Sequence, residues 1–489
     1  MVSISFDKLF AIFPILIIAM IIIIIMIIII CHRNHLINII IIISSYSVAL
    51  LYCIFIKKNL PLQITTLIYI DKISIFYTII ILISSIATII ISYLWYKKNK
   101  NIHEIDEFCL LLIIASIGAI LLTMTTNLIT FFIGIEMISI PIFGLISYGS
   151  NYHLTLEANI KYIILSVATS SILLFGIGLM YIELGNFNLF MFKPQFIKDI
   201  TSQPLLMLSF GLILSSIGFK LAIVPFQTWA PDVYQVSPTP LILFLTTVSK
   251  ISVFIILMRL IILLDITKNQ QVIIVLTFIT ISTILLGNLL AITQSNIKRM
   301  LSYSSMSHIG YLIIPLISTK INNIELQNII SLYIISYMFA NIGIFYIINN
   351  IANKIKNNDP YNIKNFFGIF YYQPKLTIIL TILVLSLAGI PSTLGFISKM
   401  QIIFFTITNK LWLITLTILI SSIISLIYYM KFISILYIEK EIIIDLQNFY
   451  KKTNTIITII ISGLCAVILL IFGILPEYLL NIITSYFTS

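Results

Sequence analysis

The stretch GFKLAIVPFQTWAPDVY, residues 218–234, places a lysine and two prolines inside a strongly apolar part of the chain. A lysine near the centre of a bilayer costs roughly 2.5–3.5 kcal/mol on insertion scales. A proline removes a backbone donor that no water replaces in hydrocarbon. Two unfavourable choices so close together need a functional cause. A helix break at Pro225 would expose backbone polar groups that can line a hydrated ion path beside Lys220.

The composition of the whole chain is that of a membrane protein. Of the 489 residues, 60% are hydrophobic and 9% are charged, and the mean hydropathy is +1.14, whereas soluble domains carry about 25% charged residues. We therefore predict an all-α polytopic membrane protein in contact with membrane lipid. The formal charge of +11 is scattered over short loops and helices and forms no basic stripe, so no nucleic-acid partner is expected.

No sequence pattern points to a bound cofactor or metal. The cysteines lie far apart, form no CxxC pair and predict neither a disulfide framework nor a metal site; they are Cys31, Cys53, Cys109 and Cys465. Nothing resembles a Rossmann glycine pattern, a P-loop or a haem-attachment motif. We expect no redox cofactor in this chain.

Hydropathy predicts fourteen membrane spans. They cover residues 11–30, 37–56, 73–96, 108–125, 127–149, 158–182, 205–228, 239–264, 271–293, 297–317, 327–349, 376–408, 411–438 and 454–484. The seventh and twelfth differ from the others, because Pro or Gly interrupts each apolar run beside a lysine. The seventh contains Pro225; the twelfth, with LSLAGIPSTLGFISKM at 385–400, contains Pro391 and Lys399.

The two interrupted spans lie five spans apart, at corresponding places in spans 4–8 and 9–13. Paired broken helices in two halves are typical of inverted-repeat transporters with a site near the membrane midplane. We therefore predict four segments along the chain. They are a three-helix segment at 1–105, a first repeat at 106–264, a second repeat at 265–438 and a last helix within 439–489.

Two charged residues are predicted at membrane depth by their distance from a helix start. Glu136, in FFIGIEMISIP, follows Asn127 by nine residues, which is about 14 Å along a helix. Lys250, in TTVSKISVF, follows Pro240 by ten residues, or about 15 Å. An intramembrane carboxylate indicates function by default, although a neutral, merely tolerated carboxyl group is the alternative for Glu136.

Lys220 and Lys399 add two lysines at the helix breaks. Any single lysine can instead extend its charged end to the membrane interface, and this alternative is strongest for Lys399. Burial favours the neutral form of a lysine and a nearby carboxylate favours the charged form, so such groups can exchange protons as their neighbours move. Together with Glu136 and Lys250, the set predicts a proton relay.

Weaker candidates remain open between two interpretations. Lys161, four residues after Glu157, is either a further relay group or half of an exposed ion pair on one helix face. His308, in SSMSHIGY, is either a proton carrier near neutral pH or a hydrogen-bonded structural histidine. Three other basic residues are interpreted as groups at the membrane interface: Lys298, Arg299 and Arg259.

These motifs resemble those of a known family. GFKLAIVPFQTWAPDVYQVSPTP, TTVSKISVF, GNLLAITQSNIKRMLSYSSMSHIGYL and LSLAGIPSTLGFISK are similar to the N subunits of bacterial proton-pumping NADH–quinone oxidoreductase, respiratory complex I, the counterparts of mitochondrial subunit 2. The similarity runs from the first helix to the last. These subunits belong to the antiporter-like proteins, related to Mrp-type cation/proton antiporters. The resemblance implies two inverted five-helix repeats with helices 7 and 12 broken.

The resemblance also implies residue roles. The family's polar axis uses a glutamate on span five and lysines on spans seven, eight and twelve, which fall here on Glu136, Lys220, Lys250 and Lys399. The sister M subunit has a glutamate at the span-twelve position, and the L subunit carries a long lateral helix. Lys399 and a chain that ends at Ser489 therefore favour the N subunit.

One position departs from the family pattern. Gln227 stands where the family usually has a histidine, and Val236 where it has a glycine. Glutamine hydrogen-bonds water but takes up no proton at physiological pH. A mechanism that needs a titrating histidine there is not expected, and a water wire past Gln227 would serve instead.

The implied function is proton translocation coupled to NADH:quinone electron transfer in other subunits, which would bind the NADH, FMN, iron–sulfur clusters and quinone. The implied partners are the M-type antiporter-like and K-type small subunits, in a bacterial inner membrane or, alternatively, a mitochondrial one. Two alternatives stay open. The chain could belong to an Mrp-type antiporter or a membrane-bound hydrogenase, or it could be a structural arm subunit whose charges fix helix packing.

Overall fold

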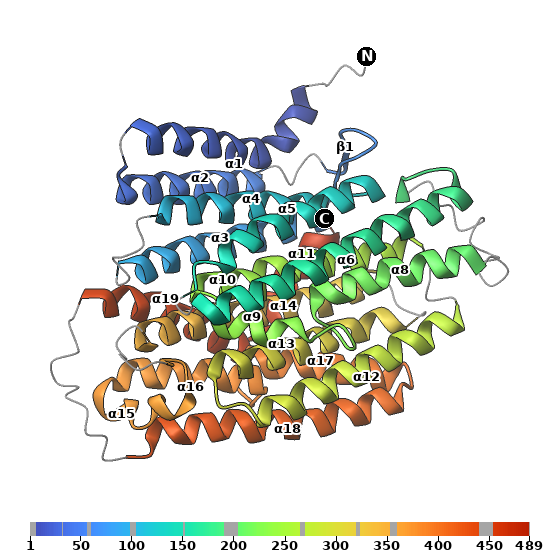
Figure 1. Ribbon diagram of the computed structural model, residues 1–489. Coiled ribbons are helices and arrows are strands. Elements are labelled where there is room, and N and C mark those ends of the chain that lie inside the picture. Colours follow the sequence, from blue (N-terminus) through green and yellow to red (C-terminus); the bar gives the residue numbers. More distant parts are fainter. Residues whose placement is uncertain are drawn as a thin grey trace. The chain divides into compact units, whose positions relative to one another are not determined.

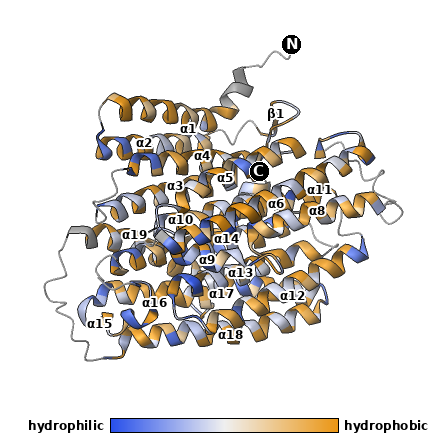
Figure 2. Cartoon of the chain, viewed as in Figure 1, coloured by the Kyte–Doolittle hydropathy of each residue, from blue (hydrophilic) through white to orange (hydrophobic). Residues whose placement is uncertain are grey.

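The computed structural model describes residues 6–31, 33–55, 60–97, 104–149, 152–189, 204–264, 269–318, 323–352, 359–439 and 453–488. These residues are almost all helical, and the sheet they contain is a short antiparallel pair, β1 (Leu62–Gln63) with β2 (Tyr69–Ile70) (Figure 1). Thirteen helices in the described part are long and apolar enough to cross a membrane. Figure 2 shows hydrophobic residues over most of the long helices and hydrophilic residues mainly near helix ends. The predicted all-α polytopic membrane fold is confirmed.

The chain divides into two compact units. Unit 1 comprises residues 1–222 and 236–272, and unit 2 comprises residues 223–235 and 273–489. The division therefore falls inside the motif quoted at the start of the sequence analysis, directly after Ala222. The predicted repeats, and the boundaries at 105, 264 and 438, stay predictions. Residue 265, the predicted start of the second repeat, and residue 56, the predicted end of the second span, lie outside the described residues.

Unit 1 is built from long helices around α3, α4 and α11. Besides the strand pair, its elements are α1 (Phe6–Cys31), α2 (His35–Phe55), α3 (Lys72–Tyr96), α4 (Ile105–Met124), α5 (Leu128–Ile146), α6 (Tyr152–Leu184), α8 (Pro204–Leu221), α10 (Thr239–Phe244), the π-helical turn η4 (Leu245–Ser249) and α11 (Lys250–Leu263). The helix pairs with the most extensive contact are α4 with α5 and α6 with α8. At Gly118 of α4 a Cβ would lie 2.7 Å from the Cβ of Met137 on α5, so glycine permits this approach.

Unit 2 packs around α14, which contacts α16, α17, α19 and α20. Its elements are α9 (Trp229–Val236, except the last residue), α12 (Gln270–Ile292, except the first turn), α13 (Ile297–Ile313), η6 (Ile314–Ile317), α14 (Asn323–Ala352), η7 (Ile363–Phe366), α15 (Ile369–Tyr372), α16 (Pro374–Ala388), α17 (Leu394–Thr408), α18 (Trp412–Tyr437), α19 (Thr453–Ile474) and α20 (Pro476–Thr488). Both α16 and α17 are too short to span a membrane alone, and together they occupy the predicted twelfth span.

The predicted helix breaks are present. In the seventh span α8 ends at Leu221, and the next helix, α9, begins at Trp229. In the twelfth span α16 ends at Ala388 and α17 begins at Leu394. Both breaks contain residues with positive φ, Ala222 at 57° in the first and Gly389 at 83° in the second, which end a right-handed helix.

Two spans differ from the prediction. The fourteenth was predicted as one helix over 454–484, but α19 ends at Ile474 and Pro476 begins a new helix, since proline cannot donate the hydrogen bond that continues α19. The eighth, predicted as a span over 239–264, contains a π-helical turn at Leu245–Ser249 that the sequence analysis did not predict.

Candidate functional site

Glu136 lies near the middle of α5. Asn127 caps this helix as the sequence indicated, because its side chain accepts the backbone N–H of Ile129 at 2.9 Å. Glu136 is half-buried, and its Oε1 is buried without a hydrogen-bond partner in the described part of the chain. Ser170 of α6 lies beside this carboxyl group, and Lys220 acts on it electrostatically. Glu136 and Lys220 are therefore near enough within unit 1 to influence each other electrostatically.

Lys220 occupies the last turn of α8 and is 6% exposed. Its Nζ donates to Ser139 Oγ at 2.6 Å and to Ser166 Oγ at 2.7 Å. These hydroxyls come from α5 and α6, so three helices converge on the ammonium group. Glu136 therefore acts on Lys220 through space, while two neutral hydroxyls hold the ammonium group in place.

Lys250 is the most deeply buried of the predicted relay lysines, at 1% exposure. It begins α11 directly after the π-helical turn Leu245–Ser249. A π-turn widens the helix and changes the register of its hydrogen bonds, and such turns occur frequently at functional sites. The sequence contains no Pro or Gly in this turn, so this irregularity was not predicted.

Lys399 lies on α17, at 6% exposure, and faces the end of α16. Its Nζ donates to the backbone carbonyls of Leu387 at 2.9 Å and Ala388 at 2.8 Å. The preceding carbonyl, that of Ser386, accepts the N–H of Gly389 at 3.1 Å. Lys399 and Gly389 thus donate hydrogen bonds to the last carbonyl groups of α16, which water could not reach in the hydrocarbon of a membrane. The ammonium group of Lys399 is therefore bonded inside unit 2 and does not extend to its surface.

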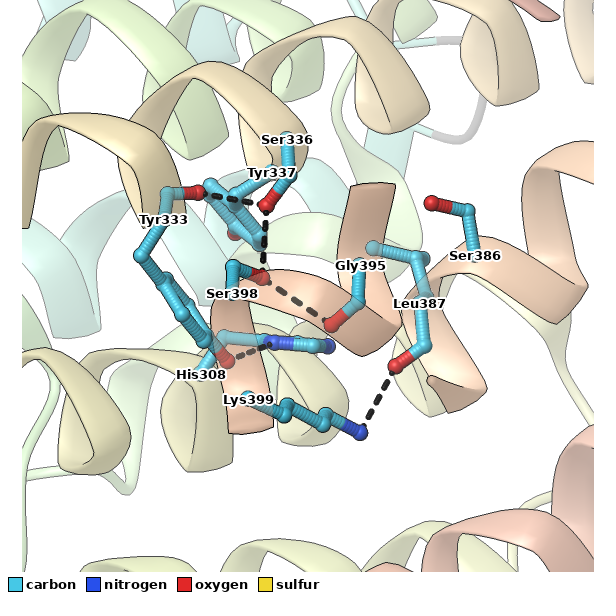
Figure 3. A pocket seen from close by; sticks show the side chains of 9 residues that line it. All are labelled: His308, Tyr333, Ser336, Tyr337, Ser386, Leu387, Gly395, Ser398 and Lys399. Carbon is cyan, nitrogen blue, oxygen red and sulfur yellow. Dashed lines mark hydrogen bonds between the residues drawn. The ribbon is translucent and has the colours of Figure 1, made fainter. Parts of the chain in front are cut away.

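His308 and Lys399 line one small cavity in unit 2, with about 10 Å³ open to a water-sized sphere, the room of a single water molecule (Figure 3). His308 is 4% exposed, and its Nδ1 is 2.7 Å from the hydroxyl of Tyr333. Among the other lining residues are Tyr337, Ser386 and Ser398. The structure therefore brings two of the predicted residues together.

Lys161 and Gln227 are placed differently. Lys161 is 47% exposed and pairs with Glu157 at 2.7 Å, which is the ion pair within one helix that we considered as the alternative. Gln227 lies in the break after α8 and is partly buried. Its side-chain oxygen is buried and has no hydrogen-bond partner among the described residues, so it can accept one from water.

Arg259 and Lys298, two of the three basic residues interpreted as interface groups, are buried within their units. Arg259 is buried, and its Nη2 donates to Asp71 Oδ1 at 2.6 Å. Asp71 is the N-cap of α3, so a capping carboxylate from a distant segment supplies the charge that keeps Arg259 inside unit 1. Lys298 is 2% exposed, with Nζ 3.5 Å from the centroid of the Tyr361 ring.

Arg299 forms hydrogen bonds with α9, the helix that follows the first break. Its Nη1 donates to Asp232 at 3.1 Å and to Gln235 at 2.8 Å, and both residues belong to α9. Its Nε donates to Gln294 at 3.1 Å. These contacts lie within unit 2 and join α9 to the start of α13.

Comparison with solved structures establishes the same fold in three respiratory or antiporter complexes. A chain of "Respiratory complex I from Thermus thermophilus with bound Aureothin" aligns with a TM-score of 0.80 and 24% identity, over 96% of this chain and 98% of that one. A chain of the archaeal membrane-bound sulfane sulfur reductase aligns with a TM-score of 0.83 and 18% identity, over 99% of this chain and 98% of that one. A chain of the Mrp complex from Dietzia sp. DQ12-45-1b aligns with a TM-score of 0.80 and 16% identity, over 99% of this chain and 97% of that one.

The family itself is identified by sequence. The family described as "NADH:quinone oxidoreductase/Mrp antiporter, TM" matches residues 125–425, which is more than half of the chain. The matched region begins just before α5 and ends within α18, so it contains Glu136 and the three predicted relay lysines. This chain is a multi-pass membrane protein that belongs to the transmembrane NADH:quinone oxidoreductase/Mrp antiporter family.

Proposed function

We propose that this chain is an N-type, proton-translocating subunit of a membrane-bound NADH–quinone oxidoreductase. The observation that carries the proposal is the position of the three relay lysines. Lys220 ends a broken helix, Lys250 follows a π-turn, and Lys399 bonds to the end of another broken helix. All three are buried. Because a buried lysine in a membrane helix costs free energy, its presence indicates a function.

The arrangement supports proton transfer along these groups. Lys220 is held by two neutral hydroxyls rather than by a bonded carboxylate, so it can lose its proton without leaving a buried, unpaired carboxylate in direct contact. A proton arriving at Glu136 weakens the attraction that favours charged Lys220. In the proposed sequence Glu136 gates Lys220, Lys220 passes its proton toward Lys250, and Lys399 exchanges protons with the far side or a neighbouring subunit.

A lysine at position 399 supports assignment to the N type within the family. The complex I chain also has the highest identity of the three structures compared, 24% against 18% and 16%. In this proposal NADH, FMN, iron–sulfur clusters and quinone are bound by other subunits. The M-type and K-type membrane subunits are the neighbours of this chain in a bacterial inner membrane.

Purification of the intact complex tests the proposal. The chain, tagged in its own host and extracted in mild detergent, should bring with it a flavin- and iron–sulfur-containing assembly that reduces quinone with NADH. The same assembly in liposomes should acidify one side during NADH oxidation. Co-purification with antiporter subunits alone would assign the chain to an Mrp-type complex, and a hydrogenase module would assign it to a hydrogenase. An assembled NADH–quinone oxidoreductase whose pumping is unaffected by substitution of the relay lysines would favour a structural subunit.

A further inference from the structure

The C-terminal end of α19 lies directly against the second helix break, within unit 2. Gly473, the last residue but one of α19, is buried there. A Cβ at this position would lie 2.5 Å from the carbonyl carbon and 2.6 Å from the Cα of Thr393, and it would also overlap the carbonyl oxygen of Ser392. All three are backbone atoms, which cannot turn aside as the end of a side chain does. Glycine is therefore what permits α19 to approach the break this closely.

A second glycine of the same helix shows that this contact is specific. Gly463 also belongs to α19, but a Cβ there would meet the end of the Ile379 side chain at an ordinary 3.8 Å. The φ of Gly473 is not positive, so its backbone conformation does not require glycine either. The close approach to the break is thus the reason that the structure gives for glycine at this position.

The break that α19 covers has a strained backbone. Ser392 has a φ of 76°, in the left-handed region that residues other than glycine rarely occupy. Such conformations persist where the surrounding structure holds them, and they are frequent at functional sites. Thr393 donates both its N–H and its hydroxyl to the carbonyl of Ile390, at 3.3 Å and 2.8 Å. The end of α19 adds a second restraint, because it packs on the backbone of Ser392 and Thr393.

The same break sets the position of Lys399. Helix α17 begins at Leu394, directly after Thr393, and carries Lys399 in its second turn. The lysine donates back across the break to the last two carbonyls of α16, at 2.9 Å and 2.8 Å. Gly395 holds α17 against α16, because a Cβ there would overlap the carbonyl of Ser386. Both lysine bonds therefore depend on how the two helices are held at the break.

We propose that Gly473 is a positioning residue for proton transfer at Lys399. Because α19 packs on the backbone of the break at Gly473, α17 stays at the distance from α16 at which both lysine bonds form. The proposal rests on the proposed proton-translocating function and extends it to α19, which lies outside the residues 125–425 matched by the family. No bond is made or broken at Gly473, which acts only through the position of Lys399.

The expected effect follows from the size of the overlap. Carbon atoms in contact lie about 3.5–4.0 Å apart, so a Cβ at 2.5 Å has to displace the break or α19 by about 1 Å. A displacement of about 1 Å can slow a reaction by about 100-fold. Because α19 and the break would share the displacement, we expect Gly473→Ala to lower proton translocation by at least about tenfold.

The test measures proton translocation by the intact complex in liposomes during NADH oxidation, in H₂O and in D₂O. Gly473→Ala should assemble with normal subunit content and should show a larger solvent isotope effect, because proton transfer at Lys399 becomes the slow step. A mere loss of folded complex would lower the rate without changing the isotope effect. Gly463→Ala, on the same helix, is the matched control and should pump normally with an unchanged isotope effect.

A second substitution tests the contact itself. In the double variant Gly473→Ala/Ser392→Gly, the glycine gives the break more backbone conformations in which its carbonyl turns away from the new Cβ. The double variant should therefore recover part of the lost rate, measured relative to Ser392→Gly alone. If only the double variant assembles, its rate and isotope effect relative to Ser392→Gly decide in the same way.

Several results would overturn the positioning role. Normal pumping in Gly473→Ala would mean that Lys399 does not depend on this contact, and no recovery in the double variant would mean that the overlap is not the cause of the loss. A lower rate with an unchanged isotope effect, or an equal loss in Gly463→Ala, would leave Gly473 a structural role alone. Failure of both Gly473→Ala and the double variant to assemble would do the same, because glycine would then be needed for folding.

Lys399→Met in the same assay separates this proposal from the proposed function. A strong loss in Lys399→Met beside normal pumping in Gly473→Ala removes only the positioning role. Normal pumping in Lys399→Met removes the proposed function itself.

Discussion

Replacing Lys220 by methionine is the sharpest test of the proposed proton path. Methionine keeps an unbranched, apolar side chain of similar length and removes only the ammonium group. The side chain it replaces is 6% exposed and donates to Ser139 and Ser166. The variant therefore separates the need for a proton carrier from the need for packing.

The stability cost of this change should be small. Two hydrogen bonds from a charged group contribute about 1.5–3 kcal/mol each. Their loss is offset by the desolvation cost of a buried cation, which is several kcal/mol. Ser139 also keeps its bond to the carbonyl of Ile135 at 2.6 Å. We expect the free energy of unfolding to change by less than about 2 kcal/mol, and the complex to assemble.

The functional cost should be large. A positioned proton-transfer group raises the rate of a proton-transfer step by about 10²–10⁴-fold. The rate of proton transfer through this chain should therefore fall by at least about 100-fold in Lys220→Met. NADH oxidation by an artificial acceptor should stay near normal, because it does not use this path, while quinone-coupled proton uptake by liposomes should fall. Lys375→Met, at an exposed lysine in the first turn of α16, is the control and should pump normally.

Lys220→Arg decides between a carrier and a fixed charge. Arginine keeps the positive charge but stays protonated, so it cannot release the proton. If Lys220 is a carrier, Lys220→Arg should pump no better than Lys220→Met. Pumping restored to the level of the unaltered complex in Lys220→Arg would refute the relay, because only the electrostatic influence of Lys220 on its surroundings would then matter.

Three further changes test single contacts. Gly395→Ala should lower the melting temperature of the complex, because a Cβ there would lie 1.8 Å from a carbonyl oxygen of α16 and overpacking costs about 1–3 kcal/mol; Gly463→Ala, with an ordinary 3.8 Å contact, is the control, and equal shifts would contradict the reasoning. Arg259→Met should destabilise the protein by about 3–5 kcal/mol, since Asp71 loses its partner. Chemical denaturation should show partial recovery in the double variant with Asp71→Asn, and no recovery would exclude an electrostatic origin. Glu136→Gln should leave assembly intact and sharply reduce proton uptake by liposomes, and normal pumping would exclude gating.

The broken helices could be predicted because their causes are local. Pro225, Pro391 and Gly389 carry backbone restrictions that act wherever they occur in a helix. Pro476 carries the same signal, and the predicted fourteenth span overlooked it. The π-turn before Lys250 has no such residue, because it results from how the helix packs, and no local pattern encodes that.

The partners of the charged residues could not be predicted for a different reason. Arg259 and Asp71 are 188 residues apart in sequence, and only the assembled unit 1 brings them together. The serines that hold Lys220 resemble the many serines in these helices that bond only to their own backbone. Helix depth identified Glu136 and Lys250, but hydrogen-bond partners depend on which helix faces meet.

Each of the two broken helices has a buried lysine close to its break, bonded to neutral groups. Lys220 is a residue of the last turn of α8, and its ammonium group donates to Ser139 and Ser166. The ammonium group of Lys399 donates to the last two carbonyls of α16 and so lies at the C-terminal end of that helix. That end carries a partial negative charge of about half an elementary charge, which stabilises a cation without a bound carboxylate. A carboxylate in direct contact would hold the proton more tightly than a helix end does. The break after α16 therefore gives the buried Lys399 neutral acceptors that would leave it able to exchange protons, as the proposed proton path requires.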